Sequence, residues 1–128
     1  MKKFNKGITI RRLRILFSKY IHMRDKKCQK CGNPDSKLDA SHIFPKKTYP
    51  SMQFMPENAK LLCGYPCHLF WWHQHPVAAG EWIKDYLGEE KYEFLLKRSQ
   101  ETRTVNRVFL EQAEIKLKEK IAELMERE

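Results

Sequence analysis

Apolar residues recur every three or four positions near the start of the chain, which is the spacing of a helix that buries one face. The pattern predicts a helix over residues 10–24, with Ile10, Leu13, Leu16, Phe17, Tyr20 and Ile21 as its apolar positions. The opposite face carries Arg11, Arg12 and Arg14. Residues 1–9 hold three lysines and a glycine, and we expect them to form a flexible basic arm.

A second amphipathic pattern runs from about Thr104 to Arg127 and predicts a long helix. Its apolar stripe consists of Leu110, Leu117 and Leu124, seven residues apart, widened by Val108, Ile115 and Ile121. Because only about two heptads are present, packing back onto the first helix is favoured over a coiled coil. A homodimer formed through this C-terminal helix is the alternative that the pattern leaves open.

Short apolar runs separated by turn residues fill the middle of the chain. They predict a turn over residues 28–36, a strand within 37–44, a strand or the approach to a helix over 59–63, a helix over 68–75, and one or two helices over 78–98 broken near Gly88. The buried candidates in the last segment are Trp82, Ile83, Tyr86, Leu87, Tyr92, Leu95 and Leu96. The expected fold class is α+β, mostly helical by residue count, with residues 1–128 forming a single domain.

Charge is distributed unevenly along the 128 residues. Residues 1–60 hold 15 Lys and Arg against 4 Asp and Glu, whereas residues 61–128 hold 10 against 12, so the net charge of +9 comes from the first half. Such an excess suggests a polyanion partner, with a merely soluble basic protein as the alternative. No apolar run is long enough for a membrane span. We therefore expect a soluble, intracellular, cytoplasmic protein.

Four cysteines form two close pairs, Cys28 with Cys31 and Cys63 with Cys67. In a chain without an export signal, such pairs more often hold a metal than form disulfides, because cytosolic thiols stay reduced. Two thiolates from each of two turns make the tetrahedral set that zinc prefers, so the pairs predict a structural Zn²⁺ ion. Unliganded core cysteines and redox pairs are the alternatives. Because the second pair is separated by three residues where two are commoner, His68 is an alternative fourth ligand.

Histidines, an aspartate and an asparagine gather between and just after the cysteine pairs. They are Asp39, His42, Asn58, His68, His73 and His75. Phosphodiester hydrolysis needs an activated water and a cation that neutralises charge on the phosphate. An imidazole with a pKa near neutrality can act as the base, and a hard ion such as Mg²⁺ or Mn²⁺ with open coordination positions supplies the rest. A closed four-thiolate site has no open position, so this second group is where we expect chemistry.

In the order of these motifs the chain resembles the HNH, or ββα-metal, nucleases, and within them the lambda-type NinG, or Rap, phage recombination endonucleases. The segments that carry the resemblance are FSKYIHMRD at 17–25, CQKCG at 28–32, LDASH at 38–42, MQFMPENAKLLC at 52–63, CH at 67–68 and the C-terminal helix. The resemblance implies a treble-clef-like, zinc-stabilised ββα-metal core over 28–75. An arm and helix over 1–27 and C-terminal helices over 76–128 flank that core. It also implies a phage or prophage protein acting in a bacterial host.

The same resemblance implies roles for individual residues. His42 is expected to be the general base, and Asn58 the asparagine that orients it and braces the loop. His68 takes the metal-ligand position after the last cysteine, and Asp39 is the acidic candidate for the second ligand of a catalytic Mg²⁺ or Mn²⁺ ion. His73 is a further ligand candidate, and the spacing does not decide between it and His75.

Two positions depart from the family pattern. Many HNH nucleases carry an acidic or histidine ligand directly before the base, where this chain has Ser41. Asp39 lies three residues before His42, so it reaches the metal only through a bulge or bend in the strand. His73 lies five residues after His68, which is a poorer match to a helix face than the seven-residue spacing of His75.

The basic residues and tryptophans complete the candidate site. Phosphate contacts are expected from Arg11, Arg12, Arg14, Lys46, Lys47 and Lys60. Trp71, Trp72 and Trp82 are expected in the core, with stacking on unpaired bases as the alternative. The expected function is a metal-dependent DNA endonuclease, and the resemblance adds a preference for branched recombination intermediates. The alternatives are a zinc-stabilised DNA-binding or assembly module without nuclease activity, and a homing or restriction nuclease, for which 128 residues leave little room.

Overall fold

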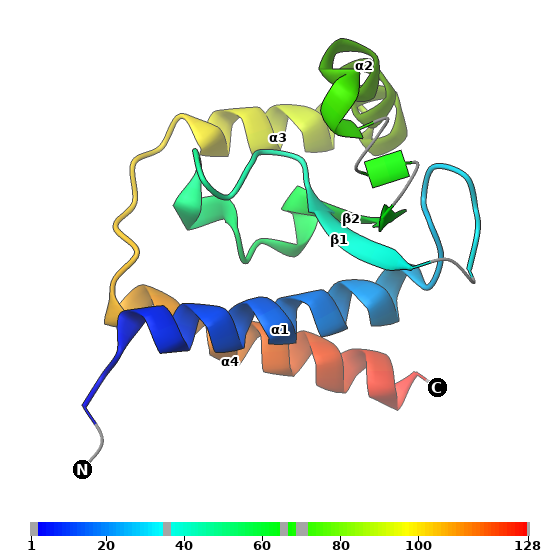
Figure 1. The fold of residues 1–128 in the computed structure, drawn as a ribbon. Helices are drawn as coiled ribbons and strands as arrows, with labels where there is room; N and C mark the ends of the chain where they lie inside the picture. The colour runs from blue at the N-terminus through cyan, green and yellow to red at the C-terminus, as the bar shows by residue number, and fades with distance from the viewer. Residues whose placement is uncertain (1–2, 35–36, 65–66, 69–71, 128) are drawn as a thin grey trace.

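The computed structural model describes residues 3–34, 37–64, 67–68 and 72–127. Within these residues, four α-helices surround a two-stranded sheet, so the α+β class and the mainly helical content are confirmed (Figure 1). The helices and strands are α1 Lys6–Asp25, β1 Leu38–His42, β2 Ala59–Cys63, α2 Pro76–Leu87, α3 Glu89–Ser99 and α4 Arg107–Glu126, with short 3₁₀ turns at Pro50–Met52 and Pro56–Asn58.

Asparagine side chains cap both long helices. The Asn5 side chain accepts a hydrogen bond from the backbone N–H of Ile8, and Asn106 does the same for Phe109. Such caps satisfy donors that the first helical turn leaves without a partner. The first helix therefore begins at Lys6, four residues before the position that its apolar spacing predicts, and the expectation of a flexible arm through residue 9 is wrong for 6–9.

Helices α1 and α4 lie side by side and run in the same direction (Figure 1). At one end Arg107 lies over the Phe4 ring, and further along Arg12 pairs with Glu114 at 2.9 Å. The shared core contains Leu13, Phe17, Tyr20, Ile21, Leu110, Leu117 and Ile121. The prediction that the C-terminal helix packs back onto the first is thus confirmed. Its stripe is narrower than predicted, because Val108 and Ile115 are 64% and 50% exposed.

The sheet pairs β1 with β2 in an antiparallel register from Leu38 opposite Cys63 to His42 opposite Ala59. Every residue of β1 has a partner, so the bulge expected near Asp39 is absent. The last turn of α1 holds β2 in place through a charged pair: Arg24 donates to the carbonyl oxygen of Ala59, and Asp25 accepts from the N–H of Leu61. Because the pair is hydrogen-bonded to the strand backbone, the charges are compensated where they are partly buried.

Helices α2 and α3 form a layer on the other side of the sheet from α1 and α4 (Figure 1). They are separated at Gly88, whose φ of 87° favours glycine, so the predicted break is confirmed. Ile83 and Leu95 are buried as predicted, whereas Tyr86 and Leu96 are 44% and 41% exposed and were wrongly expected in the core. Of the predicted helix 68–75, residues 69–71 lie outside the described part, as does Trp71. None of the described helices is both long and apolar enough to cross a membrane.

Candidate zinc centre and candidate active site

The two cysteine pairs meet between the turn after α1 and the end of β2. The four Sγ atoms of Cys28, Cys31, Cys63 and Cys67 all lie within 4.8 Å of one another. The Sγ atom of Cys63 is 3.6 Å from that of Cys31 and 3.7 Å from that of Cys28. Thiolates bound tetrahedrally to zinc at 2.3 Å lie about 3.8 Å apart, so this arrangement fits a zinc ion. It confirms the predicted clustering, with Cys67 and not His68 completing the set.

Backbone N–H groups support the first pair. The N–H of Cys31 donates to Cys28 Sγ at 3.4 Å, and the N–H of Gly32 donates to the carbonyl oxygen of Cys28. Gly32 has a φ of 80°, which closes this turn without strain because glycine has no Cβ. Burial raises the pKa of Cys28, but the N–H donors of Cys31, Cys63 and Lys30 outweigh it and lower that pKa to about 6. A thiolate is therefore favoured at Cys28 before any metal binds.

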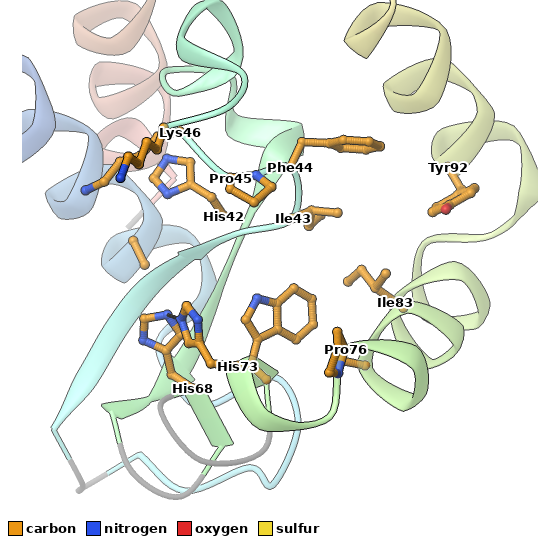
Figure 2. A pocket seen from close by; sticks show the side chains of 15 residues that line it. His42, Ile43, Phe44, Pro45, Lys46, His68, His73, Pro76, Ile83 and Tyr92 are labelled. Carbon is orange, nitrogen blue, oxygen red and sulfur yellow. Dashed lines mark hydrogen bonds between the residues drawn. The ribbon is translucent and has the colours of Figure 1, made fainter.

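A cavity of about 560 Å³ opens between the end of β1 and helix α2 (Figure 2). Three of the predicted site histidines line it. His42 comes from β1, and His68 and His73 come from the segment before α2. A smaller cavity of about 220 Å³ adjoins it, since Ala40, His42 and Lys46 line both. Asp39 lines this second cavity. The fold thus gathers Asp39, His42, His68 and His73 around two adjoining cavities.

His42 has a defined orientation. Its Nε2 atom lies 2.9 Å from the carbonyl oxygen of Gln53, and its ring stacks on Phe17 at a centroid distance of 5.5 Å. A carbonyl oxygen accepts only, so Nε2 carries the proton and Nδ1 holds the free lone pair. Burial lowers the pKa of His42; the Gln53 carbonyl opposes this, and the positive charges of Lys46 and Arg14 lower the pKa further. The neutral form of the imidazole therefore predominates at pH 7.

Asp39, His68 and His73 form a chain and do not surround one point. Asp39 Oδ2 lies 3.4 Å from His68 Nδ1, and the other ring nitrogen of His68, Nε2, lies 3.0 Å from His73 Nε2. Figure 2 shows the two rings together, on the same side of the cavity wall as His42. Within the described part of the chain, the four cysteines are the only group of three or more such ligand atoms this close together. Asp39 therefore faces His68 from the side opposite His73.

Ser41 and Asn58 are buried between these residues and the core. Ser41 is 1% exposed and its hydroxyl donates to the carbonyl oxygen of Asp39, so it does not face the cavities. Asn58 accepts from the N–H of Phe44 and donates to the carbonyl oxygens of Phe44 and Met52. It thus ties together the two ends of the loop that follows β1. That loop carries Gln53, the partner of His42.

The predicted phosphate-binding residues divide into two groups. Lys46 and Lys47 line the larger cavity, and Arg14 lines the smaller one, where it donates to the side chain of Gln53. Arg11, Arg12 and Lys60 line neither cavity. Arg12 is paired with Glu114, and Lys60 lies over the ring of Tyr86 on α2.

Trp72 and Trp82 lie edge to face and pack with Leu62 against the cysteine cluster, which supports the core interpretation for both.

Two residues that shape the site, Gln53 and Gly64, were not identified from the sequence. Gln53 acts through its backbone carbonyl, which carries no residue signature. Gly64 leaves room for Asp39, since a Cβ there would lie 2.9 Å from Asp39 Oδ2.

Comparisons with protein-family models, curated proteins and solved structures give no match for this chain.

Proposed function

We propose that this protein is a metal-dependent DNA endonuclease of the HNH type. The observation that carries the proposal is the gathering of an oriented imidazole, His42, and a histidine pair, His68 and His73, around two adjoining cavities bordered by Lys46 and Arg14. A base, ligands for a divalent ion and positive charge are the three requirements of phosphodiester hydrolysis. The sequence resemblance supports the same function through motifs that the fold brings together.

His42 acts as the general base in this proposal. Its Nε2–H is held by Gln53, so its Nδ1 lone pair takes the proton from the attacking water. The carbonyl of Gln53 also stabilises the imidazolium that forms, because Nε2–H becomes a stronger donor when the ring is charged. Asn58 keeps the Gln53 loop in position and is a positioning residue.

The residues fit a divalent ion at the histidine pair. Two imidazole nitrogens bound to one ion at about 2.1 Å and at right angles lie about 3 Å apart, which matches the 3.0 Å between His68 Nε2 and His73 Nε2. Asp39 then accepts from the Nδ1–H of His68 and orients the ring, as carboxylates do beside many metal-bound histidines. When bound, the ion supplies charge neutralisation on the phosphate. Imidazole ligands suit Mn²⁺ better than Mg²⁺.

The cationic side chains position the DNA. Lys46 and Lys47 at the larger cavity and Arg14 at the smaller one attract a phosphodiester, and they give binding that weakens with added salt. The finer points of the proposal are a treble-clef-like ββα-metal core, zinc as the ion in the cysteine cluster, and a preference for branched recombination intermediates. The branched preference is supported by the sequence resemblance alone.

A zinc-stabilised DNA-binding module without nuclease activity is the second candidate. Ser41 favours it, because the position that carries a ligand in many HNH nucleases is here a buried hydroxyl bonded to the Asp39 carbonyl. The histidine pair argues for the enzyme, since a module that only binds DNA does not need two imidazole nitrogens 3.0 Å apart beside a cavity.

Cleavage assays with the zinc-loaded protein test the proposal. Supercoiled plasmid and a four-way junction are incubated with Mn²⁺, with Mg²⁺ and without either ion, and binding is followed in parallel. The proposal predicts products that depend on the added ion, more with Mn²⁺ than with Mg²⁺. Tight binding to both DNAs with no product under any condition favours the binding module.

A further inference from the structure

A third cavity, of about 620 Å³, lies between α3, α4 and the loop of residues 51–57. It shares no lining residue with the two cavities around His42. Its lining combines positive charge with aromatic rings, and no part of the proposed nuclease mechanism uses it.

Arg98 on α3 contributes a buried guanidinium to this cavity. The residue is 7% exposed; its Nη2 donates to the carbonyl oxygen and hydroxyl of Ser51, and its Nε lies 3.9 Å from a carboxylate oxygen of Glu101. Its Nη1 is buried and, within the described residues, has no hydrogen-bond partner. A buried donor left without a partner costs about 1–3 kcal/mol, and more when it is charged. The guanidinium therefore has unused capacity for an anion.

The other charges of the cavity add to this preference. Five cations line it, namely Lys97, Arg98, Arg103, Lys116 and Lys120, against the two carboxylates Glu57 and Glu101. Arg103 pairs with Glu101 at 2.8 Å, which leaves Arg98 with only part of that carboxylate's charge. Burial lowers the pKa of Arg98 and the nearby charge of Arg103 lowers it further, whereas Glu101 raises it.

Aromatic rings form the rest of the lining. Phe54, Phe94 and Phe109 reach the cavity from the loop, from α3 and from α4, and Phe94 is 54% exposed. A small inorganic anion makes no use of such rings, whereas a nucleotide carries a base that stacks on them next to its phosphate. The combination of an unpartnered guanidinium with exposed aromatic surface fits a phosphate attached to an aromatic base.

We propose that this cavity binds one nucleotide of an unpaired DNA strand, with its phosphate at Arg98 and its base against Phe94. The proposal rests on the proposed function in taking DNA as the partner, and it gives the substrate an unpaired segment. Because Nη1 is enclosed, lining side chains must move to admit the phosphate. Lys97 and Arg103 are exposed lining residues whose long side chains can change rotamer to open the way.

Nuclear magnetic resonance titration of the zinc-loaded ¹⁵N-labelled protein tests this without added Mg²⁺ or Mn²⁺. The probes are deoxyadenosine monophosphate, deoxyadenosine, inorganic phosphate and single-stranded octadeoxyadenylate. We expect saturable shifts at residues 97–103 and 109–113 with the monophosphate and the octamer, at least fivefold weaker binding of inorganic phosphate, and no saturable shift with deoxyadenosine. Three outcomes would each overturn the proposal. They are shifts confined to the His42 cavities, equal affinities for inorganic phosphate and the monophosphate, and a bound monophosphate that the octamer fails to displace.

Variants separate this cavity from the general basic surface. Phe94→Ala and Arg103→Ala, both at exposed side chains, are expected to weaken octamer binding at least threefold, and Arg98→Lys more strongly. Lys91→Ala, on α3 but outside the cavity, is the matched control and is expected to leave binding unchanged. An equal loss in all four variants contradicts the site. Since no cleavage is needed, octamer binding here together with inactive protein refutes only the nuclease proposal.

Discussion

The Nε2 atoms of His68 and His73 lie 3.0 Å apart, although His73 comes five positions after His68 in the chain. On a regular helix a separation of four brings side chains together more closely than five. His73 therefore faces His68, although the spacing on a regular helix favours His75. His75 lies at the N-cap of α2 and does not line the cavity.

This pairing predicts different effects for the two neighbouring histidines. His73→Ala is expected to weaken binding of Mn²⁺ at the second site by at least tenfold, because one of two imidazole ligands is lost. His75→Ala, the matched control, is expected to leave that affinity unchanged. Isothermal titration of the zinc-loaded protein with Mn²⁺ measures both. A larger loss in His75→Ala than in His73→Ala would contradict the assignment.

Gly64→Ala tests whether Asp39 positions His68. The added Cβ would lie 2.9 Å from Asp39 Oδ2, closer than such contacts occur, so the carboxylate must move away from its place beside His68. We expect about a tenfold or greater loss of Mn²⁺ affinity, with the zinc content unchanged. Gly7→Ala, whose Cβ meets only Asn5 at 3.6 Å, serves as the control. Normal Mn²⁺ binding in Gly64→Ala would show that the carboxylate position is immaterial.

Zinc removal is expected to unfold the turn that carries Cys28 and Cys31 and to leave the α1–α4 pair helical. The smaller core cluster consists of three of the cysteines with Leu62, whereas the larger cluster joins α1 and α4 to Ala59 and Leu61 of β2 and contains no cysteine. Structural zinc contributes on the order of 10 kcal/mol to folding, more than so small a cluster supplies without it. Hydrogen exchange with and without a chelator measures this. Unchanged protection of the amides of Cys28 and Gly32 after complete zinc removal would contradict it.

The pH dependence of cleavage follows from the environment of His42. Burial, with Lys46 and Arg14 adding to it, lowers the pKa of this imidazole below the ordinary 6.5. The neutral base therefore predominates above pH 6.5, and activity falls as pH drops through the lowered pKa. Lys46→Ala removes a positive charge, so the acid limb of kcat/KM is expected to move to higher pH. A limb above pH 6.5 in the unmodified protein, or a shift to lower pH in Lys46→Ala, would count against His42 as the base.

Local patterns predicted much of the fold. Apolar spacing gave α1 and α4, turn residues gave the break at Gly88, and the cysteine spacing gave the cluster near β2. The errors arose where tertiary packing decides which apolar side chains are buried. Val108 and Ile115 belong to an apolar stripe by spacing, yet α1 covers only the neighbouring face of α4. A homodimer through α4 remains a prediction, and it would have to use this exposed face, since Leu110 and Leu117 are already buried.

The sequence predicted which residues form the candidate site better than it predicted how they are arranged. Asp39, His42 and His68 were chosen from their clustering near the cysteine pairs and from the family resemblance, and the fold places them around two adjoining cavities. Asp39 was expected to need a bulge, but the strand is regular and the carboxylate faces His68 Nδ1. The carbonyl of Gln53 and the space at Gly64 depend on backbone position, which residue identity does not encode.

Cleavage by His42→Ala tests the central proposal most directly. The variant removes the lone pair at Nδ1 and keeps the zinc cluster, the His68–His73 pair and the cationic side chains. In the presence of Mn²⁺ we expect the rate of plasmid or junction cleavage to fall at least a hundredfold, with DNA affinity and zinc content unchanged. Cleavage at the rate of the unmodified protein, with both of these properties retained, would contradict the proposed mechanism.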